Sequence, residues 1–313
     1  MSTSLVLAVL AHADRPCLQD QLANLRAFAP DARVVVFNGG TDRELTAGLD
    51  VATCPYSRPL THHRVGSFHG LVMQWLVEQR WDADVLVTLD SDMLLLKPGL
   101  GDHAAATMAA TGRGYLGAHF GEVLPDTAWR PGRRFHRKWA GQWQELFGLP
   151  HPYRAFNPGQ AFSGAYVEAF AAWSRRPALM AAIERTRLDA LDEIVWATLA
   201  VALGVGALDH PGGRALQLRR HSPQELGAYL ADPDVFMVHR VGMDLDAADR
   251  RLLRAVAQGQ QLNVDEPFSY DTSTAAASPV RRAAARLKDA YQAVAPAAGP
   301  GSRGKRPVEE SGR

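Results

Sequence analysis

Residues 85–96 read Val85-Leu86-Val87-Thr88-Leu89-Asp90-Ser91-Asp92-Met93-Leu94-Leu95-Leu96: a largely apolar run meets two carboxylates and then resumes. Carboxylates at the end of a buried strand are costly unless a cation meets them. Because side chains alternate along a strand, Asp90 and Asp92 project to the same side, about 6.6 Å apart. Hard divalent ions prefer oxygen ligands and are often shared with substrate phosphates. The stretch therefore predicts a site where a metal ion binds a diphosphate.

Alternating strand and helix patterns precede this stretch. Residues 5–10 form an apolar run typical of a buried parallel strand, and residues 33–37 form a second one. Apolar side chains recur at helical spacing over residues 18–28 and 68–76. Asp14 is placed to cap the first helix, with Pro16 in its first turn, and a short strand is expected near Val51. This order predicts an α/β fold with a mostly parallel central sheet flanked by helices.

Polar residues follow the predicted strands at the ends where ligands bind in such sheets. His12 follows the first strand, Asn38 the second, and Asp90 ends the strand of the opening stretch. We therefore expect His12, Asn38 and Asp90 to lie at one edge of the sheet, in reach of a bound cofactor.

The second half of the chain is harder to interpret. Residues 129–154 carry three tryptophans among six cationic side chains, too polar for a core helix and too aromatic for a linker. Three interpretations of this segment are open: a flap over a donor, a platform for an acceptor, or a lid packed on the sheet. Further elements are expected as helices over residues 178–186 and 194–203 and as strands over 114–119, 161–167, 206–208, 215–218 and 235–238.

Composition limits the functional classes. With 313 residues and a net charge of only +1, the chain has no case as a general nucleic-acid binder. Its two cysteines, Cys17 and Cys54, do not make a disulfide framework, and reduced thiols in a cytoplasm are the simpler expectation. No apolar run reaches the length of a transmembrane span, and the first residues lack the basic start of a secretory signal.

The chain end differs from the rest. From residue 279 onward it has eight Lys/Arg against three Asp/Glu. We predict one domain over residues 1–270, followed by a distinct segment over residues 271–313. Residues 271–313 are expected to form a basic helix and a disordered tail. Such a helix is either solvated or in weak contact with an anionic membrane surface.

Taken in order, these features resemble those of nucleotide-sugar-dependent glycosyltransferases of the GT-A fold, over roughly residues 5–245. Arg64-Val65-Gly66-Ser67 leads into a helix, as in the family segment that approaches the donor, and residues 86–92 resemble its Asp-x-Asp element. Asp192-Glu193 opens a helix, as the family's acidic acceptor-side pair often does. His239 follows a predicted strand where many members place a third metal ligand.

The resemblance implies a single GT-A-like domain over residues 1–270 with a smaller acceptor-side sheet, divided into a nucleotide-binding half of about 1–120 and an acceptor half of about 121–270. It also implies sugar transfer to an acceptor hydroxyl. It implies that Mn²⁺ or Mg²⁺ is held by Asp90, Asp92 and His239, and that a UDP- or GDP-sugar is the donor. His12, Asn38, Arg64 and Asp90 would contact that donor, and Asp192 or Glu193 would act as the general base.

The chain also departs from the family. His239-Arg240-Val241-Gly242 begins like the His-x-x-Gly element of some retaining members, but the Lys-Pro-Trp that completes it is missing. The Asp192-Glu193 pair instead favours inversion through a general base.

Structural roles compete with these assignments. Asp192 alone could be the N-cap of its helix, His239 a buried structural histidine, and Arg64 a surface arginine. His62, His63 and His69 fit no zinc motif.

Two other functions use the same pattern. A haloacid-dehalogenase-type phosphatase would use Asp90 as its nucleophile, although Leu94 stands where that motif has Thr or Val. A non-catalytic GT-A-like domain would bind a nucleotide without turnover. A dinucleotide-binding Gly-x-Gly-x-x-Gly after the first strand and a P-loop are both absent from the sequence.

Overall fold

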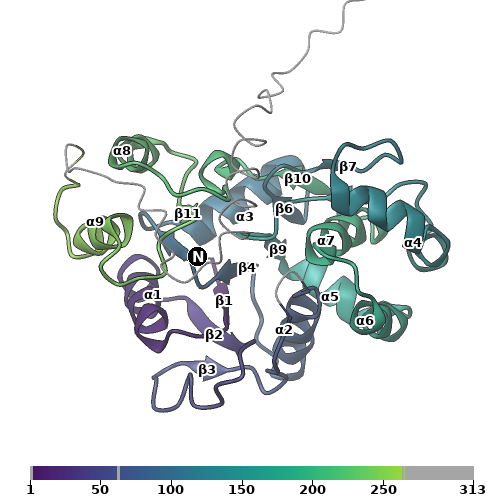
Figure 1. Ribbon diagram of the computed structural model, residues 1–313, viewed down its shortest axis with the longest axis horizontal. Coiled ribbons are helices and arrows are strands. Elements are labelled where there is room, and N and C mark those ends of the chain that lie inside the picture. The colour runs from purple at the N-terminus through teal and green to yellow at the C-terminus, as the bar shows by residue number, and fades with distance from the viewer. Residues whose placement is uncertain (1–2, 62–63, 263, 265–313) are drawn as a thin grey trace, which may run out of the picture. The chain divides into compact units, whose positions relative to one another are not determined.

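A seven-stranded sheet forms the centre of the computed structural model, which describes residues 3–61, 64–262 and 264 (Figure 1). The strands run in the order β10-β6-β9-β4-β1-β2-β3 across the sheet. Their bounds are β1 (Leu5–Ala11), β2 (Arg33–Asn38), β3 (Ala52–Thr53), β4 (Val85–Asp90), β6 (Tyr115–Gly117), β9 (Ala161–Ser163) and β10 (Ala207–Asp209).

The sheet is mostly parallel, as predicted. β1 pairs in parallel with β2 and β4, β2 with β3, and β6 with β10, whereas β9 runs antiparallel to both of its neighbours, β4 and β6. Two smaller antiparallel sheets pair β5 (Met93–Leu95) with β11 (Met237–His239), and β7 (Gly121–Glu122) with β8 (Tyr153–Arg154). The fold is therefore a mixed α/β fold with small additional sheets.

Nine α-helices and one 3-10 turn occur among the described residues. They are α1 (Arg15–Phe28), α2 (Ser67–Glu78), α3 (Leu100–Thr111), α4 (Arg130–Phe147), α5 (Gly164–Ala172), α6 (Arg176–Arg185), α7 (Leu191–Ala202), the 3-10 turn Gly213–Ala215, α8 (Pro223–Ala231) and α9 (Ala248–Ala257).

Helices cover both faces of the sheet, which explains why the interiors of its central strands are largely apolar. Along β1, Val6 and Leu10 belong to the core shared with α2, α4, α5 and α7, whereas Leu7 and Val9 belong to the core shared with α1 and α3. Alternate side chains of a strand point to opposite faces, so a strand buried on both faces has no polar side. This burial leaves the carboxyl ends of β1, β2 and β4 as the polar edge of the sheet.

The start of α1 follows the sequence prediction. The Asp14 side chain accepts a hydrogen bond from the Cys17 backbone N–H at 3.1 Å, and Pro16 lies in the first turn, where its missing N–H costs nothing. α1 thereby begins directly after β1 and packs against β5.

The segment 129–154 corrects one expectation. It contains α4, whose Phe135, Trp139 and Trp143 are buried in the core, whereas Arg133 and Arg137 are exposed. The segment is therefore a core-packed amphipathic helix, and only the lid interpretation agrees with its buried tryptophans. Counting the cationic residues of the segment made it look too polar for the core, because such a count ignores that an amphipathic helix can carry exposed charges on the side opposite its buried one.

Three shorter predictions were also inexact. Residues 161–167 are not one strand: β9 ends at Ser163, whose side chain caps α5 by accepting from the Tyr166 N–H at 3.1 Å. Residues 215–218 are not a strand, although Leu216 forms an isolated bridge with His239. The last predicted strand is shifted to β11, which includes His239 itself. Short apolar runs fit several kinds of element, so tertiary pairing decides them.

Two findings bear on the remaining expectations. Cys17 and Cys54 are buried and free. In the part of the chain that the structure describes, every helix is too short or too polar to cross a bilayer. The predicted tail, residues 271–313, lies outside the described residues, and the predicted halves at 1–120 and 121–270 stay predictions.

Candidate functional site

Asp90, Asp92 and His239 come together at the polar edge of the sheet. Asp90 ends β4, Asp92 precedes β5, and β11 brings in His239, which stands opposite Met93 in the β5–β11 ladder. One potential ligand atom from each side chain lies within 4.8 Å of the other two. The antiparallel pairing of β5 with β11 thus joins residues that are about 150 positions apart in the sequence.

The His239 ring is fixed by the backbone on one side. Its Nδ1 lies 2.5 Å from the Gln217 carbonyl oxygen, which can only accept, so Nδ1 carries the proton. Its Nε2 faces Asp92 Oδ1 at 3.3 Å. A carbonyl that holds the far nitrogen is the usual support of a histidine that binds a metal through the other one. A structural ion pair with Asp92 would account for the same contact, so metal binding by His239 stays a prediction.

The two carboxylates have opposite pKa shifts. Burial, and then the charge of Asp92, raises the pKa of Asp90 to about 6. Burial also acts to raise the pKa of Asp92, but His239 and Arg240 outweigh it and the net pKa is lowered. Arg240 Nε lies 3.5 Å from Asp92 Oδ2. The carboxylates of Asp90 and Asp92 are like charges close to each other, which is unfavourable. A cation bound between these two carboxylates would therefore lower the free energy of the site.

The pKa of His239 is also shifted by its surroundings. Burial lowers the pKa of its ring, but the Asp92 carboxylate more than offsets this, and the net pKa is raised. The donor set of two carboxylates and one imidazole fits a divalent metal ion. Because a divalent ion needs a neutral imidazole with Nε2 free, binding would displace any proton shared between His239 and Asp92.

Asn157 joins the site from the loop before β9, and the sequence analysis missed it. Its Nδ2 lies 3.3 and 3.4 Å from the two Asp90 carboxylate oxygens, and its buried Oδ1 has no hydrogen-bond partner in the described part of the chain. In the sequence this residue precedes Pro158 and Gly159, a pattern typical of a turn. Nothing in that pattern distinguishes a turn asparagine from one that contacts Asp90.

Asp192 lies in the first turn of α7 and is only 4% exposed. Its Oδ1 has no hydrogen-bond partner among the described residues. Burial is the main cause that raises its pKa to about 7, and the nearby charge of Asp90 adds to it. The N-cap position belongs to Ala190, so the interpretation of Asp192 as the cap is wrong.

Glu193 follows on α7 and is half-buried. Its backbone carbonyl accepts from the Ala155 N–H at 2.8 Å, and its charge contributes to the raised pKa of the buried Tyr115. Its role as a base stays a prediction.

The predicted donor residues His12 and Asn38 shape the loop after β2. His12 Nδ1 lies 3.0 Å from the Gly39 carbonyl oxygen. Asn38 accepts from the Gly40 N–H at 3.0 Å and donates to the Asp42 carbonyl at 2.6 Å. Gly40 lies so close to the strand end that an added Cβ would be 1.8 Å from the His12 carbonyl oxygen. The ends of β1 and β2 therefore meet, and their contact with a nucleotide stays a prediction.

Arg64 lies at the start of the segment that leads into α2. Its Nε is 4.0 Å from Asp189 Oδ1, and the same carboxylate accepts from Arg134 at 2.6 Å. The Arg64 side chain is 39% exposed, so the long contact leaves it able to reorient toward a phosphate. Its role at the donor stays a prediction.

Buried amides of α1 hold the turn that carries the carboxylates. Gln21 Nε2 donates to the carbonyls of Asp90 and Met93, at 2.8 and 2.9 Å. Asn24 donates to the Leu95 carbonyl at 3.0 Å and accepts from the Leu95 N–H at 2.7 Å, like a strand neighbour. These side chains satisfy the edge of β5 that β11 does not pair. They lie on the same face as Leu18, Leu22 and Leu25, which the sequence pattern showed only as an apolar helix face.

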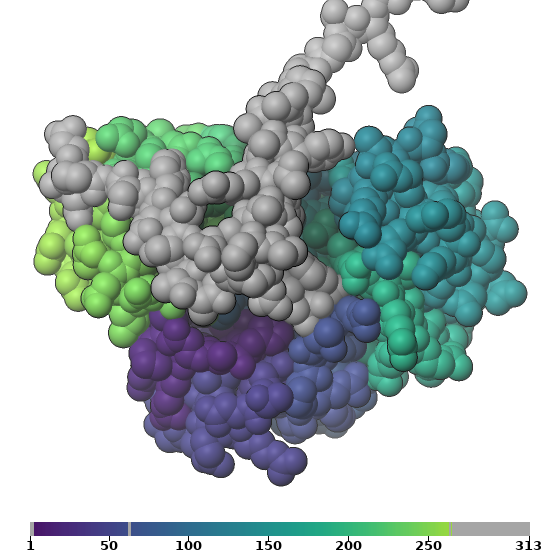
Figure 2. Space-filling model, in the orientation of Figure 1, coloured from purple at the N-terminus to yellow at the C-terminus, as the bar shows by residue number. Residues whose placement is uncertain are grey.

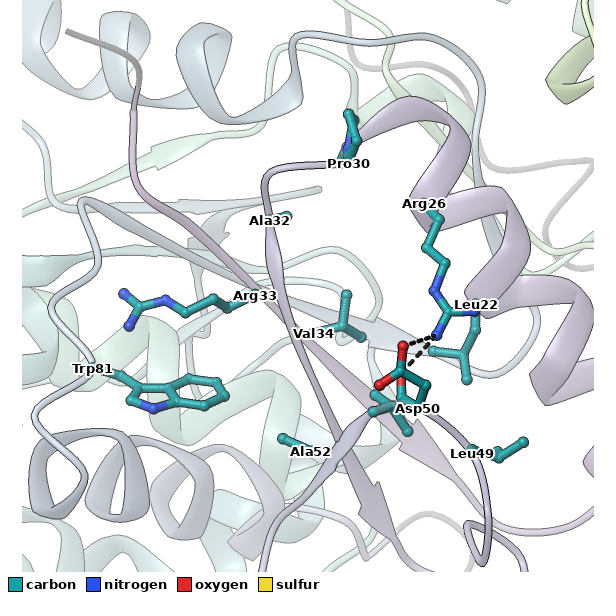
Figure 3. Close-up of a pocket in the computed structure, with 12 residues that line it drawn as sticks. Leu22, Arg26, Pro30, Ala32, Arg33, Val34, Leu49, Asp50, Ala52 and Trp81 are labelled. Carbon is teal, nitrogen blue, oxygen red and sulfur yellow. Dashed lines mark hydrogen bonds and ion pairs between the residues drawn. The ribbon is translucent and has the colours of Figure 1, made fainter.

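A surface hollow elsewhere is unrelated to this site. Residues at the start of β2 and Trp81 line this hollow (Figure 3). The site of Asp90, Asp92 and His239 lies at the opposite, carboxyl end of the sheet strands. The arginines of the hollow have partners: Arg26 pairs with Asp50 at 3.6 Å, and Arg33 lies over the Trp81 ring at 5.1 Å.

Comparisons with known proteins add little to these observations. No family model matches the chain, and no curated protein matches it. Among solved structures, the chain is similar to the galactosyltransferase LgtC in complex with donor and acceptor sugar analogues, with 12% identity and a TM-score of 0.40. An active-site mutant of LgtC gives 13% identity and a TM-score of 0.41. Each match covers 83% of this chain and 98% of the other. Similarity at this level supports no conclusion about function.

Proposed function

We propose that this protein is a glycosyltransferase that uses a nucleotide-sugar donor and a divalent metal ion. The observation that carries the proposal is the convergence of Asp90, Asp92 and the Nε2 of His239 at the carboxyl edge of a mostly parallel sheet. Ligands of open α/β sheets bind outside this edge. The resemblance of the Asp-x-Asp segment to GT-A glycosyltransferases, stated from the sequence, agrees with that position.

The side chains fit a metal ion chemically. Two carboxylates suit Mn²⁺ and Mg²⁺, and the imidazole makes Mn²⁺ the better match because Mg²⁺ is usually bound by oxygen ligands alone. A bound ion would supply positive charge for the diphosphate leaving group of a nucleotide sugar. Asn157 would orient Asp90 through its amide, and the Gln217 carbonyl would orient His239.

Asp192 supports the second part of the proposal, activation of an acceptor hydroxyl. A general base works best when its pKa lies near the working pH, and burial places the pKa of Asp192 at about 7. Its unpartnered Oδ1 is the atom that would accept the hydroxyl proton. Attack assisted by such a base would invert the configuration of the transferred sugar, with Glu193 as the alternative base. His12, Asn38 and Arg64 would contact a UDP- or GDP-sugar on the donor side.

A thermal-shift panel tests the proposal. UDP-, GDP-, CMP- and dTDP-sugars are added to the full chain with Mn²⁺ or with EDTA. A donor at 100 times its Kd stabilises the native state by about 2.7 kcal/mol, enough to raise the melting temperature measurably. We expect one nucleotide class to do so with Mn²⁺ only, and Asp92→Asn to abolish the shift. Asp126→Asn, at an exposed carboxylate elsewhere, is the matched control.

Donor turnover is the complementary measurement. The proposal predicts slow hydrolysis of the stabilising sugar nucleotide, with release of the nucleoside diphosphate, in the presence of Mn²⁺. Donor binding that is equal with EDTA and in Asp92→Asn would contradict it. Trapping of beryllofluoride on Asp90 would instead identify a phosphatase, and metal-dependent binding without turnover would identify a non-catalytic domain.

A further inference from the structure

A second hollow, of about 290 Å³, lies between α4 and the segment that joins α6 to α7. These helices lie next to one another, and the teal surface of α4 borders the greener surface of residues near 185 (Figures 1 and 2). The buried Trp139 and Leu188, each 5% exposed, form the apolar part of its wall. Ligand pockets commonly span about 300–1,000 Å³, so this one is suited to a small group and not to a whole sugar nucleotide.

The hollow is lined by three cationic side chains and by no carboxylate. Lys138 comes from α4, Arg185 from the last turn of α6, and Arg187 from the following segment. None of the three has an ion pair within the described part of the chain. Arg185 has one structural role, because its Nε donates to the Ala181 carbonyl at 3.0 Å. Lys138 and Arg187 have no such partner among the described residues.

Acidic residues do occur close by in the sequence, but they have other partners. Glu184 pairs with Arg58 at 2.6 Å, and Asp189 pairs with Arg134 at 2.6 Å. The carboxylates on either side of the 185–188 segment thus pair with cations that do not line the hollow, and neither carboxylate lines it. The C-terminal end of α6 contributes a partial negative charge there, which one cation would balance. Three cations leave an excess of positive charge facing a concave surface.

We propose that this hollow binds a phosphate group of a small molecule or a lipid headgroup. Ammonium and guanidinium groups donate charge-assisted hydrogen bonds to phosphate oxygens, and Arg187 can do so in a bidentate manner. The Thr186 side chain, also in the lining, adds a hydroxyl donor. Four peptide steps of about 3.8 Å limit the distance between the Cα atoms of Leu188 and Asp192 to about 15 Å. The phosphate site is therefore near the start of α7.

Pyrophosphate is the probe for this site. It is titrated into the full chain by calorimetry at low salt in EDTA, where the metal-free Asp90 and Asp92 repel it from the other site. The double variant Lys138→Gln/Arg187→Gln is compared with Arg137→Gln, which removes an exposed cation from the same helix outside the hollow. We expect saturable binding that the double variant weakens at least about tenfold and the control less than about twofold. Added salt should weaken the binding, since exposed charges are screened.

A second arm separates the two sources of phosphate. Vesicles of phosphatidylcholine with phosphatidylglycerol replace pyrophosphate, and sedimentation measures the bound protein. Dependence of vesicle binding on Lys138 and Arg187, without pyrophosphate binding, would identify the lipid headgroup. The proposal would be overturned if the parent protein bound neither probe. It would also be overturned if each probe bound equally well to the parent and to the double variant. Melting curves of the variants should match the parent, because all of the substituted side chains are exposed.

Discussion

Asp192 illustrates how position changes the chemistry of a residue. In the sequence it is one acid in the first turn of a helix, where helix dipoles favour acids in any case. In the structure it is buried near Asp90, and this surrounding gives its carboxyl a pKa of about 7. Sequence reasoning identified the residue but could not choose between a cap and a base, because burial is set by the tertiary packing.

The pH dependence of transfer should report this carboxyl. A base has to be ionised, so below pH 7 the protonated Asp192 is inactive, and kcat/KM should rise with pH through about 7 and then level off. Asp192→Asn should lower kcat by about 10²- to 10⁴-fold and remove the rising limb. Its donor binding should be retained. Glu193→Gln is the paired control, and the reverse result would make Glu193 the base.

The contact between Asn157 and Asp90 shows what the sequence could not predict about individual residues. The types of the metal-binding residues were apparent from Asp90-Ser91-Asp92 and from a histidine after a strand. The amide that contacts Asp90 was not, because an asparagine before a proline is first of all a turn signal. A contact across 67 positions follows only from the way β9 enters the sheet beside β4.

Among the elements, strong periodic patterns were predicted well. The strands β1, β2 and β4 and the helices α1 and α2 have long apolar runs or repeats and were found near their predicted bounds. The bounds of three elements were not predicted correctly, namely β9, α5 and the 3-10 turn, because runs of a few apolar residues fit more than one kind of element. α4 was misjudged for a different reason: counting its charges ignored that an amphipathic helix can carry exposed charges on the side opposite its buried one.

α1 does more than cover the sheet. Its Asn24 replaces a neighbouring strand along β5, just after Asp92. Asn24→Ala should lower the free energy of unfolding by about 2–6 kcal/mol, because it leaves the buried N–H and C=O of Leu95 unpaired, at about 1–3 kcal/mol each. Chemical denaturation measures the loss. Gln19→Ala, exposed on the same helix, should cost less than about 0.5 kcal/mol. Equal losses for the two variants would show that the Asn24 bonds do not support β5.

For the whole molecule, a buried charge network connects the two ends of the described chain. Arg250 of α9 is fully buried and pairs with Asp20 of α1 at 2.8 Å. It also lies 3.5 Å from the Ser91 carbonyl, between the two candidate metal ligands. α1 and α9 lie side by side in Figure 1. Such a network has no local sequence signal, since its members are about 230 positions apart.

Global stability should depend on a buried neutral histidine. His69 of α2 is fully buried among aromatic rings, and neither ring nitrogen has a hydrogen-bond partner among the described residues. Burial lowers the pKa of His69 to about 3. The unfolded chain therefore binds more protons below pH 6.5, and stability falls as the pH falls from 6.5 toward 3.

His69→Leu tests this linkage. At 1.36 kcal/mol per pH unit, His69 alone should cost about 2 kcal/mol of unfolding free energy between pH 6.5 and pH 5. The leucine variant should be more stable at pH 7 by about 1 kcal/mol, because it removes an unsatisfied polar group. It should also show a flatter decline between pH 7 and pH 5 in urea titrations. A decline as steep as that of the parent would mean that His69 is not neutral in the folded protein.

The metal site is tested most directly by a Mn²⁺ titration of the full chain without nucleotide, in which electron paramagnetic resonance reports the free ion. We predict one site in the parent and affinity weakened at least about tenfold in Asp92→Ala and in His239→Ala, since each removes a ligand of the ion. Asp126→Ala, an exposed carboxylate elsewhere, should bind as the parent does. Equal stoichiometry and affinity in all four proteins would contradict a metal site at Asp90, Asp92 and His239.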